Sequence, residues 1–252
     1  MIRCPEAVRA ANATPACCAA KASKRRDLKI AELFYSVQGE GSLVGVPSVF
    51  IRTSGCNLRC VWCDTPYTSW SPEGADLSLD QILAEVEAYP ARHVVVTGGE
   101  PMIAPEIIPL TERLRQLRRH ITIETAGTVF KPVACDLMSI SPKLANSTPV
   151  GEERWAAQHD RVRSDLGALS QLLARYDYQL KFVVEAPRDL EEVRALLAQL
   201  QAERGRVILM PEGTDREVLR ERGVWLAEIC KAEGFRYSPR LHIDLYGNRR
   251  GV

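Results

Sequence analysis

The chain has 252 residues and a formal net charge of +1 at pH 7. That length is enough for one large α/β domain with a full hydrophobic core. The near-zero charge provides no broad basic face, so direct binding to nucleic acid is not expected. No apolar run approaches the roughly 18 residues that cross a bilayer, so no membrane segment is expected either.

Cysteine usage indicates a metal centre rather than a set of disulfides. The sequence has eight cysteines, but the chain is too long and too ordinary in composition for a small disulfide scaffold. Three of the eight lie together in the segment CNLRCVWC, residues 56–63. Such clustering is typical of a metal site in a reducing cytosol, so we expect a cytoplasmic protein.

The N-terminal residues differ in composition from the rest. Residues 1–27 are rich in alanine, lysine and arginine and show no sustained periodicity. Their low hydrophobicity predicts a disordered extension, or a start codon assigned too early. A basic targeting peptide is the alternative, although the segment lacks the continuous apolar core of a secretory signal. Residues 28–252 are expected to form a single domain.

The following elements are expected in chain order. Two strands come first, at residues 29–37 and 48–52. Further strands are predicted at residues 93–96, 121–124, 136–140, 178–185 and 206–210. Helices are predicted at residues 79–89, 107–119, 165–176, 190–204 and 215–233. This alternation, with strongly apolar strands, indicates a parallel sheet with helices outside it.

Two segments do not follow the alternation. Residues 143–165 are polar and aperiodic, and we interpret them as a long loop or short-helix insertion over the mouth of the sheet. Near the C-terminus, His242 alternates with Leu241 and Ile243, which predicts a strand on which the histidine faces away from its neighbours. A histidine in an apolar context is usually a core residue, but this one is also a candidate donor to an anionic ligand.

The three clustered cysteines have C-x3-C-x2-C spacing, so three thiolates from one loop can converge. A mononuclear structural zinc site normally has four protein ligands, and iron–sulfur clusters are normally held by four thiolates. Three thiolates on such a cluster would leave one iron open to a small-molecule ligand. A zinc site completed by a distant residue and three unrelated thiols are the alternatives.

Polar or glycine-rich sequences follow successive strands. They are TGGEP at 97–101, ETAGT at 124–128, SISPK at 139–143 and MPEG at 210–213, and Lys181 lies early in another strand. Ligands bind at the carboxyl ends of parallel strands. Arg52, at the end of an apolar strand, is a candidate carboxylate clamp, with a solvated strand end as the alternative. Each sequence alone could be a simple turn, but their recurrence favours a binding site.

The cysteine loop, with Trp62 before its third cysteine, and the later TGGEP sequence resemble the radical S-adenosylmethionine (SAM) superfamily. The resemblance implies that Cys56, Cys60 and Cys63 hold a 4Fe–4S cluster whose open iron binds SAM. One electron then cleaves SAM to a radical that abstracts hydrogen from the substrate. In that superfamily the GGEP sequence binds the ammonium group of SAM.

A longer series of segments is similar to the 7-carboxy-7-deazaguanine synthase family within that superfamily. The series runs in order from about residue 29 to 252 and includes QGEG, WCDT, TGGEP, LKFVV and RLHIDLYG. The resemblance implies an incomplete TIM-like (βα)6 barrel, and we count about six strands in the alternating pattern. It also implies conversion of 6-carboxy-5,6,7,8-tetrahydropterin into 7-carboxy-7-deazaguanine with loss of ammonia, in queuosine (7-deazapurine) biosynthesis.

The same resemblance assigns site residues and partners. Thr65 matches the ligand of a Mg²⁺ ion. The residues assigned to SAM are Gly99, Glu100, Glu124, Ser141, Pro142 and Lys143. The residues assigned to substrate are Val37, Gln38, Gly39, Glu40, Arg52, Thr97 and His242. The expected partners are a flavodoxin- or ferredoxin-type electron donor and a second copy of the chain in a homodimer.

The end of the chain departs from the family pattern. Members that stop at a proline use its terminal carboxylate on substrate, and this chain ends in RRGV, so that contact is not carried over. Two other functions compete with the synthase. One is a radical SAM activase that makes a glycyl radical on a partner protein, and the other is a non-catalytic metal-binding protein.

Overall fold

The computed structural model describes residues 27–252. The predicted extension at residues 1–27 lies, except for Asp27, outside the described residues. The strands are β1 (Leu28–Val37), β2 (Pro47–Thr53), β3 (Ala75–Leu77), β4 (His93–Gly98), β5 (His120–Thr125), β6 (Leu137–Ile140), β7 (Tyr178–Val184), β8 (Val207–Pro211) and β9 (Arg236–Tyr237). The α-helices are α1 (Pro66–Ser69), α2 (Leu79–Glu87), α3 (Ile107–Gln116), α4 (Glu153–Arg163), α5 (Leu166–Arg175), α6 (Asp189–Leu200), α7 (Arg216–Glu233) and α8 (Leu241–Tyr246).

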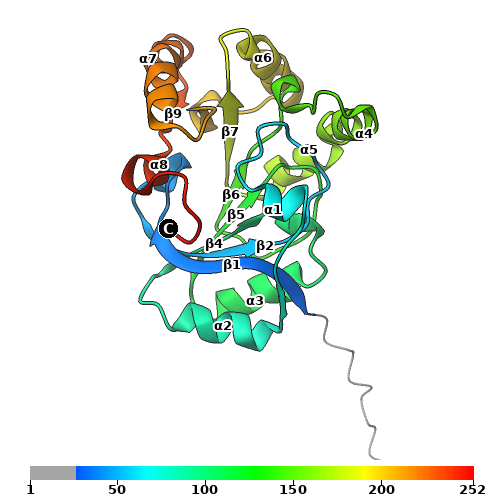
Figure 1. Ribbon diagram of the computed structural model, residues 1–252, viewed down its shortest axis with the longest axis vertical. Coiled ribbons are helices and arrows are strands. Elements are labelled where there is room, and N and C mark those ends of the chain that lie inside the picture. The colour runs from blue at the N-terminus through cyan, green and yellow to red at the C-terminus, as the bar shows by residue number, and fades with distance from the viewer. Residues whose placement is uncertain (1–26) are drawn as a thin grey trace, which may run out of the picture.

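The strands form one curved sheet in the order β3-β1-β2-β4-β5-β6-β7-β8-β9. From β2 to β9 every neighbouring pair is parallel, whereas β1 runs antiparallel to both β2 and β3. The two end strands do not pair with each other, so the sheet does not close. The prediction of an incomplete parallel barrel with outer helices is confirmed (Figure 1).

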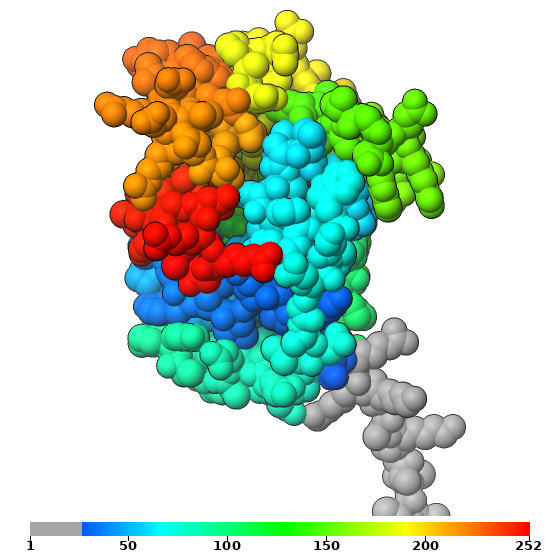
Figure 2. Space-filling view, in the orientation of Figure 1, coloured from blue at the N-terminus to red at the C-terminus, as the bar shows by residue number. Residues whose placement is uncertain are grey.

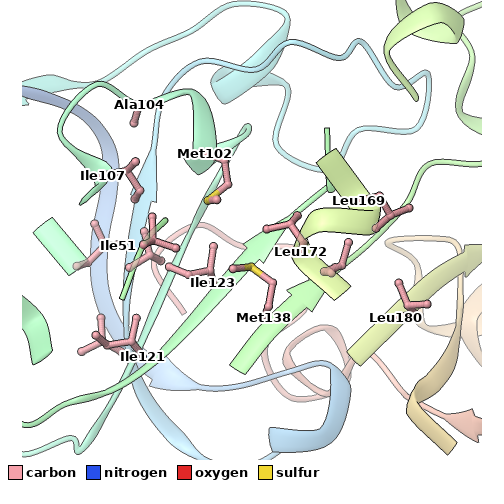
Figure 3. Packing of buried hydrophobic residues seen from close by; sticks show 14 of the residues in the cluster. Ile51, Met102, Ala104, Ile107, Ile121, Ile123, Met138, Leu169, Leu172 and Leu180 are labelled. Atoms are coloured by element: carbon pink, nitrogen blue, oxygen red, sulfur yellow. The ribbon is translucent and has the colours of Figure 1, made fainter. Parts of the chain in front are cut away.

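The core lies between the sheet and its outer helices. Ile51 from β2, Ile123 from β5 and Met138 from β6 are completely buried. Figure 3 shows them with Met102 from the loop after β4 and Leu172 from α5 in one continuous packing layer. Burying each such side chain contributes roughly 1.5–3 kcal/mol, and this holds the strands in register.

The helix ends follow local sequence signals. Ser78 and Gln81 form a reciprocal capping box at the start of α2, which satisfies backbone N–H groups that the first turn leaves unpaired. Asp215 caps α7 by accepting hydrogen bonds from the N–H groups of Glu217 and Val218. The long helix α7 ends at Gly234, whose φ of 69° suits a residue without Cβ.

The sequence predictions for the two segments outside the strand–helix alternation differ in how well they agree with the structure. The insertion at residues 143–165 contains the short 3-10 helix Ala145–Ser147 and α4, in agreement with the short-helix interpretation. The prediction of a strand around His242 is wrong, because this residue lies in α8. Six residues are too few to distinguish the helical period of about 3.6 residues from the strand period of 2. The burial of Ile243 against the fold favours the helix here. Within residues 27–252, no helix combines the length and apolarity needed to cross a membrane.

Candidate active site

The carboxyl ends of the parallel strands open into a cavity of about 730 Å³. Its wall includes all three clustered cysteines and every other residue assigned above except Glu100 and Pro142. Figure 2 shows the hollow between the cyan region, which carries the cysteine loop and α1, and the red C-terminal region. The volume is within the range of 300–1,000 Å³ that is usual for sites of small molecules and cofactors.

The cysteine loop leaves β2 and lines one side of this cavity. Burial raises the pKa of Cys56 to about 11 and that of Cys60 to about 12. Neighbouring thiols add to both shifts, because three negative charges would lie close together. Cys63 lies 3.3 Å, Sγ to Oγ, from Ser69 in α1. Without a cation the thiols of Cys56 and Cys60 stay protonated near neutral pH, whereas a bound metal would deprotonate them.

The arrangement of the thiols fits a cluster better than a single ion. Sulfurs on one tetrahedral zinc lie about 3.8 Å apart, given Zn–S bonds of about 2.3 Å. Among residues 27–252, no three side chains of His, Cys, Asp or Glu converge closely enough to bind a single metal ion. The other two cysteines in this range, Cys135 and Cys230, lie outside the cavity wall. Three free thiols on one cavity wall therefore match the donor set of a 4Fe–4S cluster with one open iron.

The insertion supports the cysteine loop from behind. His159 in α4 is 1% exposed, and its Nδ1 accepts a hydrogen bond of 3.0 Å from the backbone N–H of Arg59. Because Nδ1 accepts this bond, the proton of the neutral ring is on Nε2, which lies 2.9 Å from the Ser147 hydroxyl. Burial, aided by Arg163, lowers the pKa of His159 to about 4. Trp62 adds a second link, donating from Nε1 to the Asn146 carbonyl at 2.9 Å.

Four charged side chains on the cavity wall form a network. Glu40 accepts a hydrogen bond from Arg240 Nε at 3.0 Å and forms an ion pair with Lys181. Arg240 also forms an ion pair with Asp64, next to the predicted Mg²⁺ ligand Thr65. Burial alone would raise the pKa of Glu40, but Lys181 and Arg240 outweigh it and hold that pKa well below its usual range. Glu40 is therefore a fixed anion on the cavity wall.

A second polar cluster lies at the ends of β1, β4 and β5. Glu124 accepts hydrogen bonds from Gln38 Nε2 at 3.0 Å and from the Thr97 hydroxyl at 2.9 Å. The carboxylate of Glu124, which the resemblance assigned to SAM, thus lies among residues assigned to substrate. The backbone of the loop around Gln38 is close-packed, because a Cβ on Gly39 would lie 2.0 Å from Nδ1 of His242.

Arg52, which the sequence suggested as a carboxylate clamp, lines the cavity. Its Nε donates to Glu32 at 2.7 Å, and Glu32 also accepts a 2.6 Å hydrogen bond from the Tyr67 hydroxyl. Burial and this bond raise the pKa of Tyr67, so the phenol stays protonated. Within residues 27–252 the two terminal nitrogens of Arg52 have no acceptor. They are therefore available to an anionic ligand in the cavity.

Apart from Glu124, the residues assigned to SAM divide into two groups. Gly99, Ser141 and Lys143 lie on the cavity wall, and Lys143 Nζ donates to the Ser141 carbonyl and hydroxyl at 2.8 and 2.9 Å. A Cβ on Gly99 would lie 2.2 Å from the Gly55 carbonyl and 2.8 Å from Cys56 Cβ. Only glycine therefore lets this strand end approach the cysteine loop.

Glu100 and Pro142 form the second group, behind the wall. Glu100 is fully buried and accepts hydrogen bonds from the Thr125 hydroxyl at 2.7 Å and from the N–H groups of Met102 and Ala126 at 3.0 and 2.8 Å. Burial raises the pKa of Glu100, and the Thr125 bond partly opposes this effect. Its carboxylate thus fastens the loop after β4 to β5 and does not reach the cavity.

Sequence reasoning missed three contributors to this site. Arg240 is part of the C-terminal segment RLHIDLYG but has no sequence signal of its own, and His159 lies in an aperiodic insertion. Arg250 belongs to the RRGV end of the chain, which departs from the family pattern. In the structure it contacts Tyr67 on the cavity wall. A buried charge network gives no spacing signal when its members are far apart in the chain.

Known proteins resemble this chain over most of its length. The Radical SAM superfamily model matches residues 50–145. A protein of Halobacterium salinarum named 7-carboxy-7-deazaguanine synthase is 48% identical, with 88% of this chain and 91% of that protein covered. The protein of the same name from Escherichia coli K12 is 34% identical, with 84% and 96% covered. The crystal structure of QueE from Escherichia coli has a TM-score of 0.63 at 30% identity and covers 86% of this chain and 95% of its own.

Proposed function

Because the chain belongs to the 7-carboxy-7-deazaguanine synthase family of radical SAM enzymes, we propose that it converts 6-carboxy-5,6,7,8-tetrahydropterin into 7-carboxy-7-deazaguanine. The reaction removes ammonia, which makes the enzyme a carbon–nitrogen lyase of queuosine (7-deazapurine) biosynthesis. One observation carries the proposal for the site: three thiols and the fixed anion Glu40 face the same cavity. The cavity can therefore hold an oxidation-sensitive cofactor next to a ligand rich in N–H donors.

On the cofactor side, Cys56, Cys60 and Cys63 would hold the 4Fe–4S cluster. The bound cluster and SAM together supply the one-electron chemistry that removes a hydrogen atom from the substrate. The ammonium group of Lys143, oriented by Ser141, would pair with the carboxylate of SAM. Gly99 leaves room for close approach to the backbone, and Glu100 with Pro142 supports this wall from behind rather than touching SAM.

On the substrate side, the residues match the charges of the pterin. Arg52 offers two free N–H-bearing nitrogens to the carboxylate, in the planar geometry that suits two oxygens. Glu40 is held ionised by Lys181 and Arg240, so it can accept hydrogen bonds from the amino and ring N–H groups of the pterin. Such preset charges stabilise a reacting ligand without reorganising during the reaction.

The remaining assigned residues complete the pterin pocket. Glu124 and Thr97 form a hydrogen-bonded pair at the strand ends and would contact the ring edge. Val37 and Gly39 provide backbone surface, and His242 closes the side formed by α8. Burial lowers the pKa of His242, with an opposing effect of Glu40. His242 would therefore serve as a neutral hydrogen-bonding group near pH 7.

Thr65 is the proposed ligand of Mg²⁺. Its hydroxyl lies on the cavity wall, 3.3 Å from the Thr68 hydroxyl and 3.9 Å from Cys63 Sγ. A single protein oxygen suits Mg²⁺, since this ion keeps several waters and often takes further oxygens from its substrate. The ion would thereby bring the substrate carboxylate close to the cysteine loop.

The protein would work in the cytoplasm with a flavodoxin- or ferredoxin-type electron donor, and as a homodimer. Support for the donor comes from Val61, which lies between two of the cluster cysteines and is 53% exposed. That exposure leaves the cysteine loop accessible to a redox protein. No direct contact with nucleic acid or membrane is part of the proposal.

Anaerobic reconstitution followed by iron analysis and product mass spectrometry tests the function. Wild-type protein should bind about four irons per chain and form the deazapurine from the carboxylated pterin. Cys60→Ala should lose iron and product, whereas Cys135→Ala, which removes a thiol outside the cavity, should keep both. A colourless protein with one tightly bound zinc would contradict the proposal. A glycyl radical on a partner protein without deazapurine product would indicate an activase.

A further inference from the structure

The C-terminal segment forms part of the cavity wall. After α8 the chain turns at Gly247, which has φ of +74°, and residues 248–252 all line the cavity. Figure 1 places this end of the chain on the inner side of the curved sheet, and Figure 2 shows the red segment extending toward the cyan region. A ligand in the cavity would therefore meet this segment.

Arg250 fastens the segment to the opposite side of the opening. Its guanidinium carbon lies 3.4 Å from the ring centroid of Tyr67, and its Nη1 lies 3.1 Å from Oε2 of Glu73. The ion pair is more than half exposed and contributes little alone. Stacking of a planar guanidinium on an aromatic ring adds about 0.5–1 kcal/mol at an exposed site. The two contacts together define one position for the segment.

The ring under Arg250 belongs to the hydrogen-bond chain of the carboxylate clamp. Tyr67 donates to Glu32 at 2.6 Å, and Glu32 accepts from Arg52 at 2.7 Å. The position of the C-terminal segment is thus linked through two residues to the guanidinium that faces the cavity. Moving Arg250 away would free the Tyr67 ring and loosen this chain.

Arg249, which precedes Arg250 in the chain, carries a charge that is not paired within residues 27–252. It lines the cavity and is exposed, and its guanidinium has no hydrogen-bond or ion-pair partner within residues 27–252. Its backbone is fixed by a hydrogen bond of 2.9 Å from its N–H to the Gly247 carbonyl. Arg52 and Arg249 are therefore two cavity-lining cations with free N–H groups.

We propose that the segment Gly247–Val252 is a substrate-binding strap in which Arg250 is the latch and Arg249 binds the carboxylate of the pterin together with Arg52. The inference rests on the proposed function, which supplies the anionic ligand. Arg249 is a binding residue in this scheme, and Arg250 is a positioning residue that acts through Arg249 and Tyr67. A second guanidinium on the carboxylate would select carboxylated over uncarboxylated pterins.

Steady-state kinetics of reconstituted enzyme test the binding role. Arg249→Gln should raise the KM for the carboxylated pterin about tenfold, the loss of one charge-assisted contact, with kcat within about twofold. Arg250→Gln should raise KM in the same way, and Arg250→Lys, which keeps the ion pair but not the stacking, should fall between. Arg175→Gln removes an exposed arginine that contacts Tyr176 and does not line the cavity, and it should leave KM unchanged. An unchanged KM in Arg249→Gln would overturn the proposal.

Hydrogen exchange tests the latch without turnover. Backbone amides of residues 247–252 should exchange several-fold faster in Arg250→Gln than in wild type, because their tether is lost, and no faster in Arg175→Gln. Equal exchange in Arg250→Gln and wild type would overturn the latch. If wild-type enzyme forms no deazapurine, the proposed function fails, whereas the exchange result still reports on the strap.

Discussion

Glu40 and Arg240 are 200 residues apart in the sequence, yet Arg240 Nε lies 3.0 Å from Oε1 of Glu40. The same guanidinium donates to the Gly213 carbonyl at 2.6 Å and forms an ion pair with Asp64. Three chain segments that surround the cavity therefore meet at one side chain: the loop after β1, the cysteine loop and the end of β8. The charge and planar shape of Arg240 set the spacing between the proposed pterin acceptor and the proposed metal site.

Arg240→Ala should be strongly destabilising. It removes the buried pair with Glu40, and breaking a buried pair typically costs about 3–5 kcal/mol. The pair with Asp64, whose side chain is 40% exposed, should add less. Urea denaturation should show this loss, and activity should fall with it. Arg240→Lys should lose less stability but should not restore activity, because one ammonium cannot replace a three-way fork. Arg194→Ala, which breaks an exposed pair with Glu233, should cost less than about 1 kcal/mol.

Gly99→Ala should prevent assembly of the cluster. The added Cβ would lie 2.2 Å from the Gly55 carbonyl and 2.8 Å from Cys56 Cβ, so the loop that carries Cys56 must move. Iron content after reconstitution should drop well below that of wild type. Gly205→Ala is the matched control, since its Cβ would meet no atom within 4 Å. Equal iron content in the two variants would show that the close approach is not needed.

Thr65→Val should abolish the response to magnesium. The substitution keeps the shape of the side chain but removes the hydroxyl, and with it the proposed ligand of Mg²⁺. The rate of product formation should then no longer depend on added Mg²⁺, and Thr65→Ser should retain the dependence. The measurement is the rate of product formation as a function of Mg²⁺ concentration for wild type and each variant. The same curve for wild type and Thr65→Val would remove Thr65 from the metal site.

His159 should make the fold sensitive to mild acid. Its pKa is lowered from 6.5 to about 4 in the folded chain, so the unfolded chain takes up the proton first as pH falls. The stability present above pH 6.5 should therefore decrease down to about pH 4, by at most about 3 kcal/mol. Protonation would also break the bond that Nδ1 accepts from Arg59.

The test is denaturation of wild type and His159→Gln across that pH window. Wild type should lose stability more steeply than the variant between pH 6.5 and 4. Both chains share all other titrating groups, so the difference isolates this ring. Parallel curves for the two chains would mean that His159 does not carry the effect.

The sequence alone determined the framework and the cysteine loop. Alternating apolar strands and amphipathic helices specify a parallel sheet, because both periodicities are local. The thiols of Cys56, Cys60 and Cys63 share one short loop, so their spacing alone shows that they can converge. The glycine-rich and polar segments directly follow predicted strands, and the carboxyl ends of parallel strands share one edge of the sheet, so their order in the chain assigns them to that edge.

Only the tertiary structure decided which distant side chains complete the site. Arg240, His159 and Arg250 act through partners dozens to hundreds of residues away, and no local pattern encodes such pairs. The helix at residues 241–246 likewise depends on the burial of Ile243 rather than on its own sequence. The physical reason is common to all of these: the gain from burying a charge pair or an apolar side chain exists only after the sheet has brought its strand ends together.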